Sequence, residues 1–129
     1  MQMSGQIFLT ELARLLGAHQ PEDSAALYLT LESDVQVTVS LETSSIESVL
    51  LYAELGDVPS GDAFLQDMGQ ANFLGAGTEG AVLALRPDDP VACLFKQVPI
   101  GIHSPDDFLP LLKTFCEVAT NWQQRIRTY

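Results

Sequence analysis

Two groups of residues in this 129-residue sequence carry side chains that could do covalent or acid–base chemistry. Cys93 with His103 could supply a nucleophile and its base, and the pairs Asp88-Asp89 and Asp106-Asp107 could act in general acid–base catalysis. Cys93, however, falls in a strand-like run, and the aspartates stand where loops and helix starts favour aspartate. We therefore expect that the protein is not an enzyme.

The cysteines and histidines also do not predict a metal site. Cys93 and Cys116 lie in apolar sequence, which is typical of buried, reduced thiols rather than of a disulfide framework. His19 and His103 stand in loop-like sequence beside Pro or Ser, and their spacing matches no zinc pattern. We expect neither a metal nor a cofactor.

A run of glycines resembles a nucleotide-binding turn. Residues Gly75 to Gly80 read Gly-Ala-Gly-Thr-Glu-Gly and match the pattern G-x-G-x-x-G. That pattern binds a pyrophosphate where a strand precedes the glycines and a helix follows them. Here the order is reversed, because a helical pattern precedes the glycines and the strand-like run Ala81–Leu85 follows. The glycines therefore predict a plain flexible turn.

The composition is strongly acidic. Six Lys and Arg stand against 17 Asp and Glu, for a net charge of -11. No Lys or Arg occurs between Arg14 and Arg86, where a solubilising acidic face is the simplest interpretation. Such a field repels nucleic acid and anionic membranes and favours basic or weakly charged partners. We expect no nucleic-acid and no membrane partner.

Length and hydropathy predict a single domain, residues 1–129, in the cytoplasm. With 47% hydrophobic residues the chain is too apolar to be disordered. The N-terminal residues 1–12 lack the basic region of a signal peptide. The longest uncharged run, Met68–Thr78, is too short to span a bilayer.

Three stretches have helical patterns. The first is Gln6–Leu16, which Gly17 ends; the second begins at a Ser60 cap, with Phe64, Met68 and Ala71 on one stripe and Leu65 beside it. The third begins at Ser104, followed by Pro105 at the first helical position. The apolar stripe of the third helix consists of Phe108, Leu112, Phe115, Ala119, Trp122 and Ile126.

Five stretches have strand patterns. Ala26–Leu31 and 35–42 alternate with a period of two, and Ala81–Leu85 and Val91–Val98 form a hairpin. Ile46–Leu55 fits a helix or a strand, and its short link to the preceding hairpin favours a third antiparallel strand. The predicted order is α-β-β-β-α-β-β-α, an α+β fold.

This order in a small acidic chain resembles the class I chaperones of bacterial type III secretion, the CesT/Tir chaperone-like family. The resemblance lies in the run Val49–Gly56, the helix Phe64–Phe73 ending Gln-Ala-Asn-Phe, the strand Gly80–Leu85, and a C-terminal helix with Phe115 and Trp122. It covers nearly the whole chain, in pattern, length and charge rather than in one diagnostic motif.

The resemblance implies a twisted, mainly antiparallel sheet with three helices, paired into a homodimer. It implies a virulence-associated chaperone that holds an extended, N-terminal segment of a secreted effector before export, without ATP. The alternative is a regulator of the same fold that sequesters a transcriptional regulator or another chaperone. The implied dimer contacts are Phe64, Leu65, Met68, Phe73, Val82 and Leu83. The groove residues chosen for effector binding are Leu12, Leu15, Leu16, Tyr28, Val37 and Val39.

Overall fold

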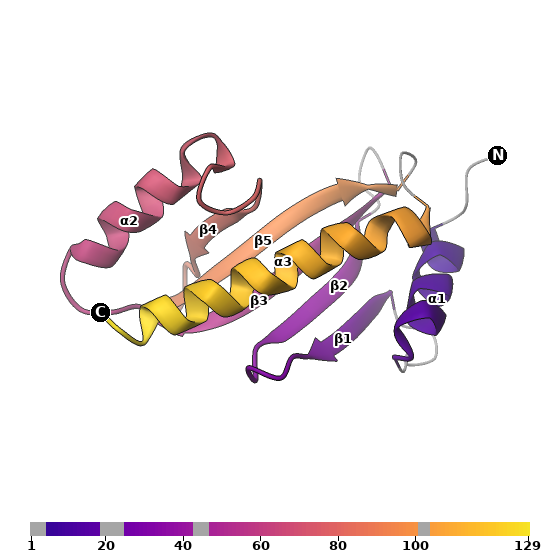
Figure 1. Cartoon of the computed structure of the whole chain (residues 1–129), viewed down its shortest axis with the longest axis horizontal. Coiled ribbons are helices and arrows are strands. Elements are labelled where there is room, and N and C mark those ends of the chain that lie inside the picture. Colours follow the sequence, from indigo (N-terminus) through magenta and orange to yellow (C-terminus); the bar gives the residue numbers. More distant parts are fainter. Residues whose placement is uncertain (1–4, 19–24, 43–46, 101–103) are drawn as a thin grey trace.

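The computed structural model describes residues 5–18, 25–42, 47–100 and 104–129, and they follow the predicted order of elements (Figure 1). The helices are α1 (Gly5–Leu16), α2 (Ala63–Asn72) and α3 (Pro105–Ile126), and a 3-10 turn η1 (Phe73–Gly75) follows α2. The strands are β1 (Ala26–Thr30), β2 (Gln36–Glu42), β3 (Ser48–Asp57), β4 (Val82–Leu85) and β5 (Val91–Pro99). The strand interpretation of 46–55 is confirmed from Ser48 onward, since residues 43–46 lie outside the described ranges.

The strands form one sheet in the order β1-β2-β3-β5-β4, in which every neighbouring pair is antiparallel. The long strands β3 and β5 are central, while the short strands β1 and β4 form the two edges. The sheet is therefore open, with β1 and β4 as its two edge strands.

Two helices pack on one face of the sheet. Helix α3 runs along β3, and α1 lies against α3 and over β1 and β2 (Figure 1). The rings of Phe8 and Phe108 join the two helices edge to face at 5.5 Å. Beneath them a fully buried row crosses three strands, with Leu27 opposite Val39 and Val39 opposite Leu51. The core thus lies between this helical layer and one face of the sheet.

The C-terminal helix follows its sequence pattern closely. Ser104 Oγ accepts a hydrogen bond from the Asp107 N–H at 3.2 Å, and Pro105 begins the helix. All six residues of the predicted apolar stripe are buried. Both the cap and the buried face predicted for α3 are confirmed.

Helix α2 begins later than the Ser60 cap predicted, so that prediction is wrong. Its N-cap is Asp62, whose side chain makes no capping hydrogen bond. Gly61 has φ 88°, a left-handed conformation that cannot belong to a right-handed helix. The stretch before Ala63 is therefore a turn.

The glycine run after α2 is more tightly packed than a plain flexible turn. A Cβ on Gly77 would lie 2.8 Å from the Ala71 Cβ, and one on Gly75 would lie 2.8 Å from the Gly80 Cα. Trp122 Nε1 donates to the Gly77 carbonyl at 3.1 Å. The turn is thus fixed to both α2 and α3. As expected, a strand rather than a helix follows it.

Candidate binding surfaces on the open face and edges of the sheet

The face of the sheet opposite α1 and α3 carries a row of partly exposed side chains. Paired residues of neighbouring antiparallel strands point to the same side. Tyr28 pairs with Thr38, Thr38 with Tyr52, Tyr52 with Phe95 and Phe95 with Val82. We call these five residues the outer row. Tyr28 is 64% exposed, so the row begins at a free aromatic side chain.

The charged groups beside the outer row pair with one another. Arg86 contacts Glu54 at 2.9 Å and Asp88 at 3.2 Å. The Tyr52 hydroxyl donates to Glu54 at 3.4 Å. Desolvation, with smaller contributions from Cys93 and Glu54, raises the pKa of Tyr52 to about 12. At this end of the outer face the single Arg86 guanidinium lies among the carboxylates of Glu54, Asp88 and Asp89, so the cluster keeps a net negative charge.

Neither cysteine has the properties of a nucleophile. Both thiols are free. Burial raises the pKa of Cys93, whose thiol donates to the Ala84 carbonyl at 3.4 Å, and burial raises the pKa of Cys116 to about 11. A catalytic thiol needs the opposite shift. His19 and His103 lie outside the described residues, and within those residues no cluster of His, Cys, Asp and Glu could hold a metal ion.

The β1 edge presents unpaired backbone groups. Leu41 N–H bonds to the Ala25 carbonyl, and Leu31 N–H to the Val35 carbonyl, each at 2.9 Å. Because antiparallel pairs alternate, odd-numbered residues of β1 bond to β2 and even-numbered ones point their N–H and C=O away from it. Within the described ranges no partner bonds to the outward amides of Tyr28 and Thr30.

The β4 edge is closed by a side chain. Asn72, the last residue of α2, donates from Nδ2 to the Leu83 carbonyl and accepts from the Leu83 N–H, both at 2.8 Å. One amide side chain thus satisfies both outward backbone groups of a β4 residue, and α2 lies alongside that strand (Figure 1).

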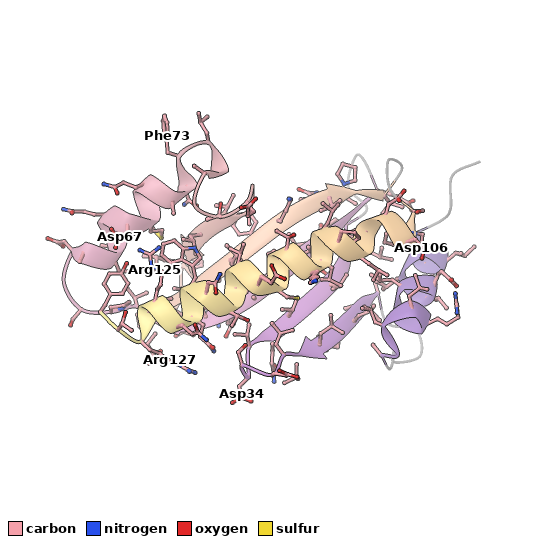
Figure 2. All side chains as sticks on the ribbon, in the orientation of Figure 1. Asp34, Asp67, Phe73, Asp106, Arg125 and Arg127 are labelled. Atoms are coloured by element: carbon pink, nitrogen blue, oxygen red, sulfur yellow. The ribbon has the colours of Figure 1, made fainter. Side chains whose placement is uncertain are left out.

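Helix α2 is anchored at one end and exposed along its outer side. Phe64 is buried, with its ring edge to face against Trp122 and Tyr129 at 6.4 and 5.6 Å. Arg125 lies 3.4 Å from Asp67 and 4.0 Å over the Trp122 ring (Figure 2).

The 3-10 turn after α2 carries the two most exposed large apolar side chains in the described part of the chain, Phe73 at 71% and Leu74 at 90%. Leu65, in the first turn of α2, is also exposed. Phe73 points away from the sheet (Figure 2). Leu74 has φ 54°, which is uncommon for a residue with a side chain. Exposed apolar side chains that lie close together, as Phe73 and Leu74 do, are candidates for an interaction surface.

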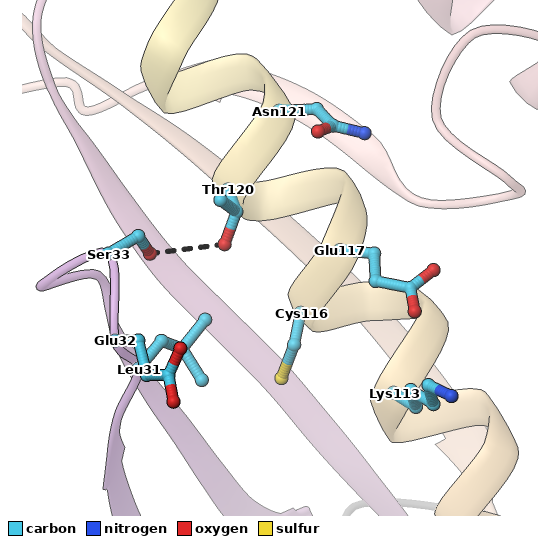
Figure 3. A pocket seen from close by; sticks show the side chains of 8 residues that line it. All are labelled: Leu31, Glu32, Ser33, Lys113, Cys116, Glu117, Thr120 and Asn121. Carbon is cyan, nitrogen blue, oxygen red and sulfur yellow. Dashed lines mark hydrogen bonds between the residues drawn. The ribbon is translucent and has the colours of Figure 1, made fainter.

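A pocket of about 540 Å³ lies between the β1–β2 turn and α3 (Figure 3). We call it the hairpin pocket. Leu31 and Cys116 face it from opposite sides, and a 3.1 Å hydrogen bond between Ser33 Oγ and Thr120 Oγ1 joins its walls. The residues that line it are Leu31, Glu32, Ser33, Lys113, Cys116, Glu117, Thr120 and Asn121.

The predicted groove residues do not form one surface. Leu12, Val37 and Val39 are buried in the core of this chain, because they face the layer between the helices and the sheet. They are therefore not available to a partner. Tyr28 and Leu16 are exposed and Leu15 is half-buried, on separate elements.

The residues predicted for the dimer contact also divide into exposed and buried ones. Leu65, Phe73 and Val82 are exposed, and Met68 is half-buried. Phe64 and Leu83 are buried within the chain, where they hold α2 and β4 in place. The sequence reasoning missed Leu74 and the hairpin pocket, whose two walls come from segments far apart in sequence.

Comparisons with solved structures identify the fold. The chaperone SycH of Yersinia pestis, solved with a fragment of YscM2, shares 18% identity and a TM-score of 0.70, over 92% of this chain and 98% of that one. A chain of the ExsC–ExsE complex shares 18% identity and a TM-score of 0.73, over 98% and 97% of the two chains. A chain of the ExoU–SpcU complex of Pseudomonas aeruginosa shares 21% identity and a TM-score of 0.66, over 91% of this chain and 92% of that one.

Sequence comparison assigns the family. The search of curated protein sequences yields no significant match. A family model described as the Tir chaperone protein (CesT) family matches residues 7–123, which is most of the chain. No helix of the described residues is long and apolar enough to cross a membrane. The resemblance drawn from the sequence is confirmed: the chain belongs to the CesT family of type III secretion chaperones.

Proposed function

We propose that this protein is a cytoplasmic chaperone that binds an extended, N-terminal segment of a type III secreted effector and holds it before export, without ATP. The observation that carries the proposal is the β1 edge, where Tyr28 and Thr30 direct outward backbone groups that have no partner among the described residues. An extended segment can pair with such an edge through its main chain. An extended, unfolded client segment has its backbone groups free along its whole length, so it can pair with this edge without rearranging a fold of its own.

The outer row and the charge of the chain support the same function. Tyr28, at the open edge, begins the outer row, whose aromatic and apolar members could contact the apolar residues of a bound segment. The net charge of -11 attracts basic segments and speeds their encounter. Holding of this kind requires neither a cofactor nor a catalytic residue.

The proposed chaperone is a homodimer of two 129-residue, single-domain chains. Leu65, Phe73 and Val82, with Leu74 at the end of α2, leave an apolar surface that a second copy can cover. Phe64 and Leu83 contribute by holding that surface in position rather than by contacting the partner.

Co-purification from the native bacterium, with the mass of the complex measured by light scattering, tests this function. We expect two copies of the chain with one secreted protein, bound near its N-terminus. A monomer without a client would contradict the proposal. A transcriptional regulator or another chaperone as the bound protein would favour the alternative, a regulatory protein of the same fold.

A further inference from the structure

We propose that a second pocket, between the end of α3 and an irregular part of β3, binds a free α-amino acid with a large apolar side chain. The pocket has a volume of about 520 Å³, and we call it the bulge pocket. The residues that line it are Glu54, Leu55, Gly56, Asp57, Val91, Gln123, Ile126 and Arg127. This inference goes beyond the proposed function, which involves no small-molecule ligand.

A buried amide group at this pocket lacks a hydrogen-bond partner. The buried polar side chains among the described residues are Ser48, Thr78 and Gln123. Ser48 Oγ accepts from Gln97 Nε2 at 2.7 Å, and Thr78 Oγ1 donates to the Ala81 carbonyl. Gln123 is only 7% exposed, and its Oε1 has no partner in the described part of the chain. Because folded proteins rarely leave a buried acceptor unsatisfied, this oxygen indicates a donor that arrives with a ligand.

The backbone of β3 is irregular beside this amide. The register with β5 shifts between Glu54 and Gly56, which makes Leu55 the extra residue of a bulge. Gly56 has φ 130°, which a residue with a side chain rarely adopts, and a Cβ there would meet nothing within 4 Å. Bulges are common beside binding sites, where they interrupt regular pairing. The bulge thus leaves open space next to the buried amide.

The charged groups of the bulge pocket distinguish between classes of ligand. Asp57 ends β3, and Arg127 lies at the C-terminal end of α3 (Figure 2). Both are exposed, and neither forms an ion pair with another described residue. A purely cationic ligand would meet Arg127, and a purely anionic one would meet Asp57. A zwitterion satisfies both, because its ammonium donates to Asp57 and its carboxylate accepts from Arg127.

The remaining lining fits an apolar side chain. Leu55 and Ile126 are buried, and Val91 is half-buried. Apolar walls with a few polar groups are typical of small-molecule sites, and the volume of the pocket has room for a leucine or a phenylalanine. An ammonium group has three N–H donors, enough for both Asp57 and Gln123 Oε1. The free charges, the unpartnered acceptor and the apolar walls together point to an apolar α-amino acid.

A panel of small probes tests this ligand class on the whole chain. L-Leucine and L-phenylalanine carry all three features. N-acetyl-L-leucine lacks the ammonium, L-leucinamide lacks the carboxylate, and glycine lacks the apolar side chain. We expect each incomplete probe to bind at least about tenfold more weakly than L-leucine, measured by NMR titration of the backbone amides. The shifted amides should include those of Leu55, Gly56 and Arg127.

Matched variants separate the loss of the ligand contact from damage to the fold. Gln123→Leu replaces an unpartnered amide with an apolar side chain of similar size, so it should weaken L-leucine binding about tenfold without lowering the melting temperature. Gln124→Leu makes the same change at the exposed neighbouring position and should leave binding unchanged. Arg127→Gln should weaken binding of L-leucine but not of L-leucinamide, whereas a loss of folding would weaken both.

Three results would overturn the proposal. One is the absence of amide shifts around the bulge pocket at about 10 mM L-leucine, which would leave a bound water as the only partner of Gln123 Oε1. The second is equal binding of all probes, and the third is unchanged L-leucine binding by Gln123→Leu. Effector binding is measured separately by co-purification, so none of these results bears on the proposed function.

Discussion

The two edges of this sheet are short strands of similar length that differ in what their outer backbone groups contact. At β1, Tyr28 and Thr30 present an N–H and a C=O without a partner among the described residues. At β4, the corresponding groups of Leu83 are bonded to Asn72. The two edges therefore differ in whether a side chain of this chain already bonds their outward backbone groups. Under the proposed function, this difference directs a client strand to β1 rather than to β4.

A single side-chain amide, that of Asn72, bonds the outward backbone groups of Leu83 at the β4 edge. An asparagine side chain has a donor and an acceptor on one planar amide, the same pair that a strand offers across a ladder. Because Asn72 is the last residue of α2, its side chain can reach Leu83, and the packing of α2 orients that side chain toward β4. The closed edge thus depends on α2 being anchored, whereas the open edge depends only on β1 itself.

The largest expected effect comes from releasing the helix that closes β4. Phe64→Ala removes a buried ring that contacts Trp122 and Tyr129, and should lower the free energy of unfolding by about 3–5 kcal/mol. Urea denaturation measures the loss. Gln66→Ala, on the exposed side of the same helix, should change stability by no more than about 0.5 kcal/mol. Equal losses in the two variants would show that Phe64 does not anchor α2.

The next effect tests the open edge. Tyr28→Pro removes an outward N–H and places a ring at the edge, where proline is tolerated in strands. Loss of one or two main-chain hydrogen bonds should weaken client binding by roughly 10- to 100-fold, measured by isothermal titration calorimetry.

Two neighbouring variants control that experiment. Tyr28→Ala keeps the N–H and should bind more tightly than the proline variant. Leu29→Pro removes an amide that bonds inward to β2 and should instead destabilise the fold. If both prolines affect only stability, β1 is not the binding edge.

A smaller effect tests the closed edge. Asn72→Leu removes both hydrogen bonds to Leu83 and should lower the free energy of unfolding by about 1–3 kcal/mol. It should also speed amide hydrogen exchange at Leu83 and cause self-association that increases with protein concentration, because the β4 edge would then be exposed. Asn72→Asp retains an acceptor for the Leu83 N–H. Its stability and its exchange rate at Leu83 should therefore lie between those of the unmodified protein and those of Asn72→Leu. Unchanged exchange at Leu83 would contradict the role of Asn72.

The smallest effect is a pH dependence at the hairpin pocket. The pKa of Cys116 is raised to about 11 because its thiol is desolvated, so folding favours the protonated form. This contribution to stability is complete below the ordinary thiol pKa and is lost as pH rises toward 11. We expect the melting temperature to fall across that alkaline interval, and to fall less for Cys116→Ala, in which only the raised pKa values of Cys93 and Tyr52 still contribute. A melting curve shifted equally in both proteins would refute the assignment.

The order of elements could be predicted because each carries a local signal. Alternation in 35–42 and the apolar stripe of α3 identify their elements without any knowledge of the rest of the chain. The Ser60 cap was wrong because the conformation of Gly61 decides where α2 can start.

The binding surfaces were harder to predict because they depend on which face the helices cover. Leu12, Val37 and Val39 are as apolar as any groove residue, and only the packing of α1 and α3 shows that they are core. The hairpin pocket joins Ser33 to Thr120, which are 87 residues apart, and no sequence pattern links them. The sequence placed Asn72 at the end of a helix, but no sequence pattern predicted that its side chain would bond to Leu83.

The packed glycine turn has a practical consequence for experiments on this protein. Glycine-rich turns are common choices for inserting epitope tags or fluorescent reporters, since such sites usually tolerate extra residues. At 75–80 the close approach of Gly77 to Ala71 and of Gly75 to Gly80 leaves no room even for a Cβ at either glycine, so an insert that shifts these residues would disrupt the packing. The exposed Pro87–Pro90 turn between β4 and β5 lies away from these contacts and is the better insertion point.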